Sequence, residues 1–145
     1  MGLPTMTNSP TKSWRHGECH CGEVGFAVNL PDSVVALSCN CSICAKTGFI
    51  HLIVEKPDFK IERGAESLTT YTFGTHEAKH LFCAKCGVKA FYVPRSHPNG
   101  WSVNLRALDA DADLQLRFEE FDGANWEKNV SKINPELAQP GANDA

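Results

Sequence analysis

The 145-residue sequence has no long apolar run, no cluster of positive charge and no internal repeat. Its longest uncharged apolar stretch, residues 49–54, is far shorter than the roughly 20 residues needed to cross a bilayer, so we expect no membrane span. Basic side chains number 14 against 17 acidic ones, which argues against a general nucleic-acid binder. Residues 1–14 lack the apolar segment of a secretory signal, and we therefore expect a cytoplasmic protein.

Common nucleotide-binding and hydrolase motifs are also missing. The sequence contains no Walker A loop, no GxGxxG after an expected strand and no GxSxG, which argues against the enzyme classes that those motifs define. The apolar share of 42% and the charged share of 21% are ordinary for a chain that folds as one globular domain. They exclude a disordered chain and a coiled coil.

Helical patterning is sparse, and short β-rich runs dominate. Gly, Pro, Asn and Asp separate most of these runs, a pattern typical of a mainly antiparallel sheet. Apolar and polar residues alternate in 114–121, which predicts a strand whose buried face carries Leu114, Leu116 and Phe118. The expected strands are 24–29, 34–37, 49–54, 59–61, 68–73, 79–82, 88–93, 101–104 and 114–121, with helical turns at 42–47 and 125–132.

We expect one domain over residues 14–133, flanked by flexible segments at 1–13 and 134–145. Both flanks carry prolines, and the second has little apolar surface that could dock on a core. The predicted fold class is mainly β, with short antiparallel strands and few helical turns.

Seven cysteines are many for a chain expected in a reducing compartment, and an odd number does not suit a disulfide framework. Two pairs have a glycine directly behind them, Cys-His-Cys-Gly at 19–22 and Cys-Ala-Lys-Cys-Gly at 83–87. Glycine permits the positive φ of a tight turn, so both sulfurs of a pair can face one ion. The alternatives are buried, inert cysteines and iron–sulfur ligation, although the spacings match neither ferredoxin pattern. We predict a zinc site of four sulfurs that staples the first strands to the later sheet, with the ligands Cys19, Cys21, Cys83 and Cys86.

The middle cluster, CxCxxC at residues 39–44, places three sulfurs on one turn of chain. Three protein ligands leave a fourth zinc position for water or substrate, and soft sulfur ligands favour an incoming thiol. Two alternatives stay open. His51, His80 or an acidic residue closes the site and makes it structural, or the cysteines act as redox-active thiols without metal, favoured by nearby Lys46. The predicted ligands of this second site are Cys39, Cys41 and Cys44.

Several segments together match the pattern of a known family. They are GxCxCG at 17–22, CxCxxC at 39–44, Ala-Lys-Thr-Gly at 45–48, CxxCG at 83–87, Tyr-Val-Pro-Arg-Ser at 92–96, Trp-Ser-Val-Asn at 101–104 and Leu-Asp at 108–109. In these segments the chain resembles the glutathione-dependent formaldehyde-activating enzyme family, which includes centromere protein V. The resemblance spans about residues 14–126, and the Tyr-Val-Pro-Arg-Ser segment looks closer to the centromere-protein-V branch.

The resemblance implies a mainly β domain with two zinc ions per chain. One is structural, on the four-cysteine site, and the other is of the catalytic type, on the three-cysteine site. The activity that it implies is condensation of formaldehyde with glutathione to S-hydroxymethylglutathione, which is classed as a carbon–sulfur lyase reaction.

A small thiol such as glutathione is the expected partner, entering the open zinc position and adding to an aldehyde carbon. Its carboxylates need cations, for which Lys46 and Arg95 are the candidates, with Lys79 and Arg106 behind them. His51 lies on an apolar strand, as core histidines do, and we assign no general base. The alternatives to an enzyme are a non-catalytic zinc-stabilised binding module of the centromere-protein-V type and a thiol redox or metal sensor.

Overall fold

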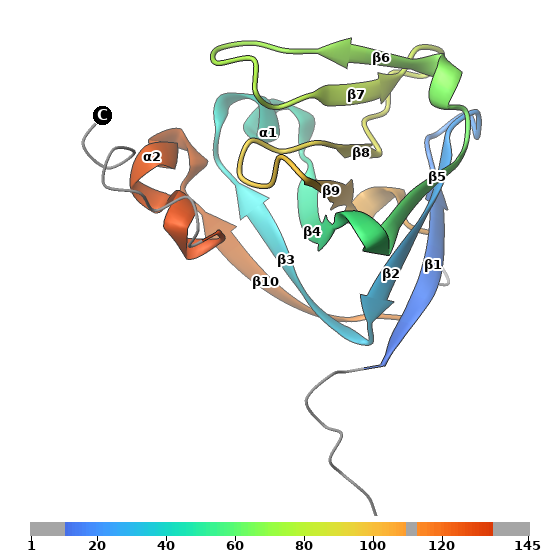
Figure 1. Ribbon diagram of the computed structural model, residues 1–145, viewed down its shortest axis with the longest axis horizontal. Coiled ribbons are helices and arrows are strands. Elements are labelled where there is room, and N and C mark those ends of the chain that lie inside the picture. The colour runs from blue at the N-terminus through green and yellow to red at the C-terminus, as the bar shows by residue number, and fades with distance from the viewer. Residues whose placement is uncertain (1–10, 110–112, 135–145) are drawn as a thin grey trace, which may run out of the picture.

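Short strands dominate the part of the chain that the computed structural model describes, residues 11–109 and 113–134 (Figure 1). The strands are β1 (Lys12–Glu18), β2 (Gly25–Pro31), β3 (Ser33–Cys39), β4 (Ile50–Glu55), β5 (Phe59–Arg63), β6 (Leu68–Tyr71), β7 (His80–Cys83), β8 (Phe91–Tyr92), β9 (Gly100–Asn104) and β10 (Gln115–Phe121). The helices are α1 (Ser42–Thr47) and α2 (Trp126–Asn129), and the 3₁₀ turns are η2 (Lys56–Asp58), η3 (Ala65–Ser67), η4 (Leu105–Ala107), η5 (Gly123–Asn125) and η6 (Val130–Lys132). The mainly β fold predicted from the sequence is confirmed.

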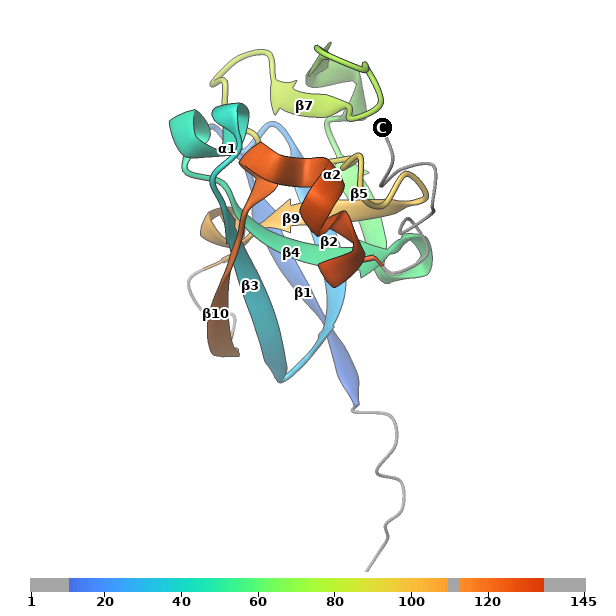
Figure 2. The same ribbon diagram turned by 90° about the vertical axis from the view of Figure 1, so that its left-hand side faces the viewer.

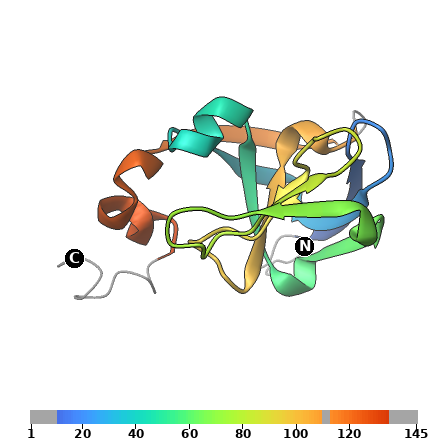
Figure 3. The same cartoon turned by 90° about the horizontal axis from the view of Figure 1, so that it is seen from above.

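The described strands form three sheets. One has the order β1-β2-β5, a larger one has the order β10-β3-β4-β9-β8, and β6 pairs with β7. Neighbouring strands are antiparallel except β10 and β3, which run parallel. Helices α1 and α2 and the β6–β7 pair gather at one end of the domain (Figures 1 and 2). The view from above places α1 beside the segment that contains α2 (Figure 3).

An aromatic core joins the two larger sheets. Phe26 on β2 lies 5.7 Å from Phe91 on β8, and Phe59 on β5 lies 4.6 Å from Trp101 on β9, between ring centroids. Burying each such side chain stabilises the fold by about 1.5–3 kcal/mol. Cys19 and Cys83 belong to the same buried cluster, so the first predicted metal site borders the core.

Two strands differ from the sequence-based expectation. The sequence does not predict β1, because Lys-Ser-Trp-Arg-His-Gly-Glu is mostly polar, yet every residue of this strand pairs with β2. The strand expected at 88–93 is reduced to the two residues of β8. Because β1 begins at Lys12, residues 12 and 13 belong to the sheet. The rest of the two flanks predicted to be flexible lies outside the described residues, apart from Thr11 and Asn134.

The strand expected at 114–121 forms as β10, but the prediction of a buried face is wrong for two of its three residues. Leu116 is 39% exposed and Phe118 is 60% exposed, whereas Leu114, just before the strand, packs against the core. Among the described strands, β10 lies at the edge of its sheet and pairs with β3 alone, so alternation here does not mark a covered face. Among the described residues, no helix is long and apolar enough to cross a membrane.

Candidate functional site

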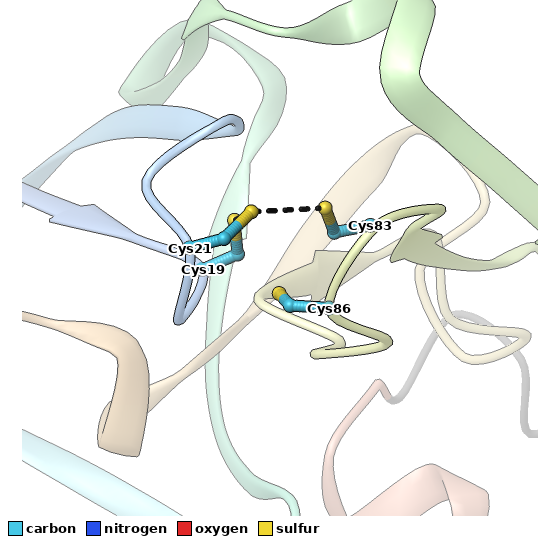
Figure 4. Close-up of side chains that lie close together, drawn as sticks. All are labelled: Cys19, Cys21, Cys83 and Cys86. Carbon is cyan, nitrogen blue, oxygen red and sulfur yellow. Dashed lines mark hydrogen bonds between the residues drawn. The ribbon is translucent and has the colours of Figure 1, made fainter.

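The first cysteine cluster is built from two tight turns that face each other (Figure 4). One turn follows β1 and the other begins at the end of β7. Gly22 and Gly87 have φ angles of +83° and +78°, a region that residues with a Cβ rarely adopt. Their backbone N–H groups donate to the carbonyl oxygens of Cys19 and Cys83, at 3.2 and 2.8 Å. These turns aim the sulfurs of each pair at those of the other.

The spacing of the four sulfurs fits one metal ion. The sulfurs of Cys19, Cys21, Cys83 and Cys86 all lie within 4.8 Å of one another. The distances Cys19–Cys21 and Cys21–Cys83 are both 3.7 Å, much longer than the roughly 2 Å of a disulfide. A tetrahedral ion with metal–sulfur bonds of about 2.3 Å separates its ligands by about 3.8 Å. The donor set therefore matches a tetrahedral thiolate site in both chemistry and spacing.

The second cluster lies where β3 passes into α1. Cys39 ends the strand, Cys41 precedes the first residue of the helix, and Cys44 is buried within it. Gly48, with φ +71°, ends α1 and donates its N–H to the carbonyl oxygen of Cys44 at 3.0 Å. The three sulfurs lie within 4.8 Å of one another and could hold a metal ion.

The pKa values of the three thiols of this cluster are shifted in different directions. Interaction with Cys39 and then with Cys44 lowers the pKa of the Cys41 thiol. Interaction with Cys39 and then with Cys41 raises the pKa of the Cys44 thiol. Interaction with Cys41 also raises the pKa of the Cys39 thiol, so Cys41 is the thiol of this cluster that ionises most readily.

His51 contacts this cluster through one sulfur only. Its Nε2 lies 3.1 Å from Sγ of Cys44, and its Nδ1 lies 2.8 Å from the hydroxyl of Ser102. Burial, followed by the charge of Lys89, lowers the pKa of His51 to about 4, so the ring is neutral near pH 7. Among the described residues, the atoms close enough to share one ion at this site are the three sulfurs, and His51 is not among them.

A cavity of about 500 Å³ opens beside the second cluster. Its size suits a small organic molecule. The three cysteines, His51 and His80 supply polar atoms, while most of the remaining wall is apolar. The apolar wall includes Leu37, Ile43, Ile53, Phe73, Tyr92 and Trp126, drawn from β3, α1, β4, the chain after β6, β8 and α2.

Arg95 lines this cavity, whereas Lys46 does not. The guanidinium carbon of Arg95 lies 3.7 Å from the centroid of the Trp126 ring. Its Nε lies 2.7 Å from a carboxylate oxygen of Glu77, and a terminal nitrogen lies 3.7 Å from one of Glu127. Lys46 is exposed on α1, outside the cavity lining, as are Lys79 and Arg106.

Sequence reasoning missed Lys89, which lies behind the cavity wall. Lys89 is 8% exposed, and its Nζ lies 2.6 Å from Nδ1 of His80. The available signal is its position between Val88 and Ala90 in an apolar run, where a lysine is unusual. Trp126 carries no such signal, because only the folded chain brings it to Arg95.

The chain thus combines a mainly β domain with two cysteine clusters, the second beside a cavity. A family model described as glutathione-dependent formaldehyde-activating enzyme matches residues 14–123, and the chain belongs to this family. A curated relative from Halomonas elongata that is named for the same enzyme is 33% identical over 103 residues, and the match covers 66% of each chain. A crystal structure of a Rhodobacter sphaeroides protein is similar with a TM-score of 0.60 and 37% identity, covering 70% of this chain and 99% of that one.

Proposed function

We propose that the protein is a zinc-dependent carbon–sulfur lyase that forms, and in reverse splits, the adduct of glutathione and formaldehyde. The observation that carries the proposal is the position of the second cluster. Three sulfurs that share no fourth protein ligand among the described residues border a cavity of about 500 Å³. Membership in the family supplies the two reactants.

The residues present fit two zinc ions with different tasks. Cys19, Cys21, Cys83 and Cys86 would hold a structural ion, since four thiolates complete a tetrahedron. The three cysteines 39, 41 and 44 would hold the second. Zinc bound there acts as a Lewis acid and lowers the pKa of a thiol that joins the three cysteines.

The side chains around the second cluster orient it and keep water out. The hydroxyl of Ser102 lies 2.8 Å from Nδ1 of His51 and orients the ring, and in the tautomer that accepts there, the Nε2–H donates to the sulfur of Cys44. The apolar wall limits the water that competes with a thiol for the cluster. In the forward direction the glutathione sulfur adds to the carbonyl carbon, and the oxygen takes up a proton.

Arg95 is the residue that we propose for binding a carboxylate of glutathione. Trp126 holds its guanidinium plane at the cavity wall, and Glu127 contacts it at only 3.7 Å. A substrate carboxylate can replace this long, exposed contact with a closer one. Lys46 stays a weaker candidate, because it lies outside the lining.

The cavity supports an enzyme more than the binding-module alternative, because a surface that captures another protein has no need of a concave, mostly apolar space beside three thiols. The test is ¹³C exchange NMR of formaldehyde and glutathione at equilibrium, with protein purified in the absence of chelator. We expect the protein to accelerate exchange between formaldehyde hydrate and S-hydroxymethylglutathione, and Cys41→Ser to abolish the acceleration. Equal exchange rates with wild-type protein, with Cys41→Ser and without protein would contradict the proposal.

A further inference from the structure

A buried lysine and a histidine form a pair at the wall of the cavity. Lys89, which follows the second tight turn of the first cluster, is enclosed by aromatic rings: its Nζ lies 3.9 Å from the ring centroid of Tyr92 and 5.0 Å from that of Phe49. No carboxylate of residues 11–109 or 113–134 lies within 4.0 Å of this ammonium group. Its hydrogen-bond partner is Nδ1 of His80, at 2.6 Å. A buried cation without a carboxylate partner is costly, and perturbed buried cations of this kind are found at functional sites.

The ring of His80 is held firmly in place. It stacks on Tyr92 at 5.0 Å between centroids, with 14° between the ring planes, and on Phe73 at 5.4 Å, with 21°. Lys89 binds the Nδ1 edge of the ring. His80 lines the cavity and Lys89 does not, so the Nδ1 edge faces away from the cavity.

The other ring nitrogen, Nε2, is left accessible. Among the described residues, no side chain or backbone group forms a hydrogen bond with Nε2, and Nε2 is not a fully buried atom. Because His80 lines the cavity and Lys89 occupies the Nδ1 side of its ring, Nε2 is the ring nitrogen on the cavity side.

The protonation states follow from the same contacts. Burial lowers the pKa of Lys89 only to about 8, so the ammonium form prevails at pH 7 and acts as a donor. Burial, followed by the charge of Lys89, lowers the pKa of His80 to about 4, so its ring is neutral. A neutral ring that accepts at Nδ1 carries its proton on Nε2.

We propose that His80 is a catalytic hydrogen-bond donor, whose Nε2–H binds the carbonyl oxygen of the aldehyde, and that Lys89 is the positioning residue that fixes this tautomer. The inference rests on the proposed function and adds a residue to it. As the sulfur–carbon bond forms, the C=O π pair moves onto oxygen, where the Nε2–H stabilises the developing charge. The oxygen then takes a proton from water while the proton of the thiol passes to solvent, so no oxidant or reductant is required.

The arrangement itself is tested by NMR without any substrate. Long-range ¹H–¹⁵N spectra of the zinc-loaded protein distinguish the two tautomers of each histidine. We expect His80 in the Nε2–H form in the wild type and a mixture of tautomers in Lys89→Met, with the exposed-lysine variant Lys56→Met unchanged. His80 protonated at Nδ1 in the wild type would overturn the proposal whatever the turnover.

The catalytic role is tested by exchange kinetics on the same variants. We expect His80→Phe, which keeps the ring stack but removes the donor, to lower kcat about 100-fold, while zinc content and glutathione affinity stay the same. Lys89→Met should lower kcat by a smaller factor of about 10, and His80→Gln, which restores an N–H donor, should recover part of the loss. Wild-type kcat in His80→Phe would overturn this inference alone, whereas no acceleration by the wild type would overturn the proposed function.

Discussion

Gly123 leaves room for the second cysteine cluster. A Cβ at this position would collide with Sγ of Cys39 and lie 3.2 Å from Cβ of Cys41. The backbone here is not in the left-handed region, so space and not conformation requires the glycine. The chain after β10 therefore helps to shape a cluster whose ligands lie about 80 residues earlier in the sequence.

We expect Gly123→Ala to displace Cys39 and to weaken the second metal site selectively. Metal analysis should give about one zinc per chain in place of two, with the melting temperature nearly unchanged, because the first site is untouched. Ser38→Ala, an exposed neighbour of the cluster on β3, is the matched control and should keep both ions. Two zinc ions and full activity in Gly123→Ala would show that the cluster tolerates the shift.

Lys89 gives a prediction about stability. Burial lowers its pKa from 10.5 to about 8, so the folded state releases this proton more readily than the unfolded state. Below pH 8 both states carry the charge, and burial of charged Lys89 lowers the free energy of unfolding by its full amount. As the pH rises from about 8 to 10.5, the folded state loses the proton first, so the free energy of unfolding rises and this penalty disappears. Lys89→Met should therefore be more stable than wild type at pH 7, by about 3 kcal/mol, with a smaller gain at pH 9.5. Urea unfolding at both pH values measures this. A loss of stability at pH 7 would contradict it.

Single residues were predictable where their spacing carried the signal. The cysteine spacings with their trailing glycines predicted both groups of sulfurs, because each pair or triple is brought together by a local turn. Lys46 lies next to the second cluster in the sequence, but α1 turns it outward. Lys89 and His80 are nine residues apart and meet only because β7 and the chain before β8 lie side by side. No spacing rule describes that contact.

At the scale of elements, β10 pairs in parallel with β3 and so brings the chain that follows it to the second cysteine cluster. Phe121 pairs with Cys39 in the strand register, which delivers η5 and α2 to the second cluster. The side chain of Asn40 fixes this connection, donating to Asp122 at 3.0 Å and accepting from the N–H of Ala124 at 2.9 Å. The alternation of apolar and polar residues in 114–121 predicted a strand, but it could not predict that the strand pairs in parallel or that it lies at the edge of the sheet.

The edge position of β10 is tested by comparing two phenylalanines. Phe118 is 60% exposed, so Phe118→Thr should change the free energy of unfolding by less than about 0.5 kcal/mol. Phe91 is fully buried between Phe26 and Phe59, so Phe91→Ala should lower the free energy of unfolding by about 3–5 kcal/mol. Chemical denaturation measures both. A large loss at Phe118 would mean that another surface covers β10 in solution.

On the scale of the whole molecule, the first cluster ties distant parts of the chain together. It joins the turn after β1, in the three-stranded sheet, to the turn after β7, in the pair β6–β7 (Figure 4). The unfolded chain has no such site, so binding of an ion there would contribute directly to folding. The sequence predicted this link, since the pairs are widely separated. It did not predict the three sheets or the cavity, which depend on long-range strand pairing.

The two clusters should respond differently to loss of a ligand. Cys83→Ser removes a proposed ligand of the first site and should prevent folding, or lower the melting temperature sharply, as followed by circular dichroism. Cys41→Ser should keep the fold and one zinc while activity is lost. If both variants unfolded to the same extent, the second cluster would be structural, and the proposed lyase activity would lose its main support.

The central claim is that four cysteines complete one metal site and three cysteines leave a second site with an open position. Its most direct test is a titration of the cobalt-substituted protein with glutathione, monitored by absorption spectroscopy. We predict two cobalt ions per chain and a gain of sulfur-to-cobalt absorption that saturates at one glutathione per chain. The same titration of Cys41→Ser should leave the spectrum unchanged. A wild-type spectrum that does not change on addition of glutathione, or a spectrum of Cys41→Ser that does, would contradict an open three-cysteine site.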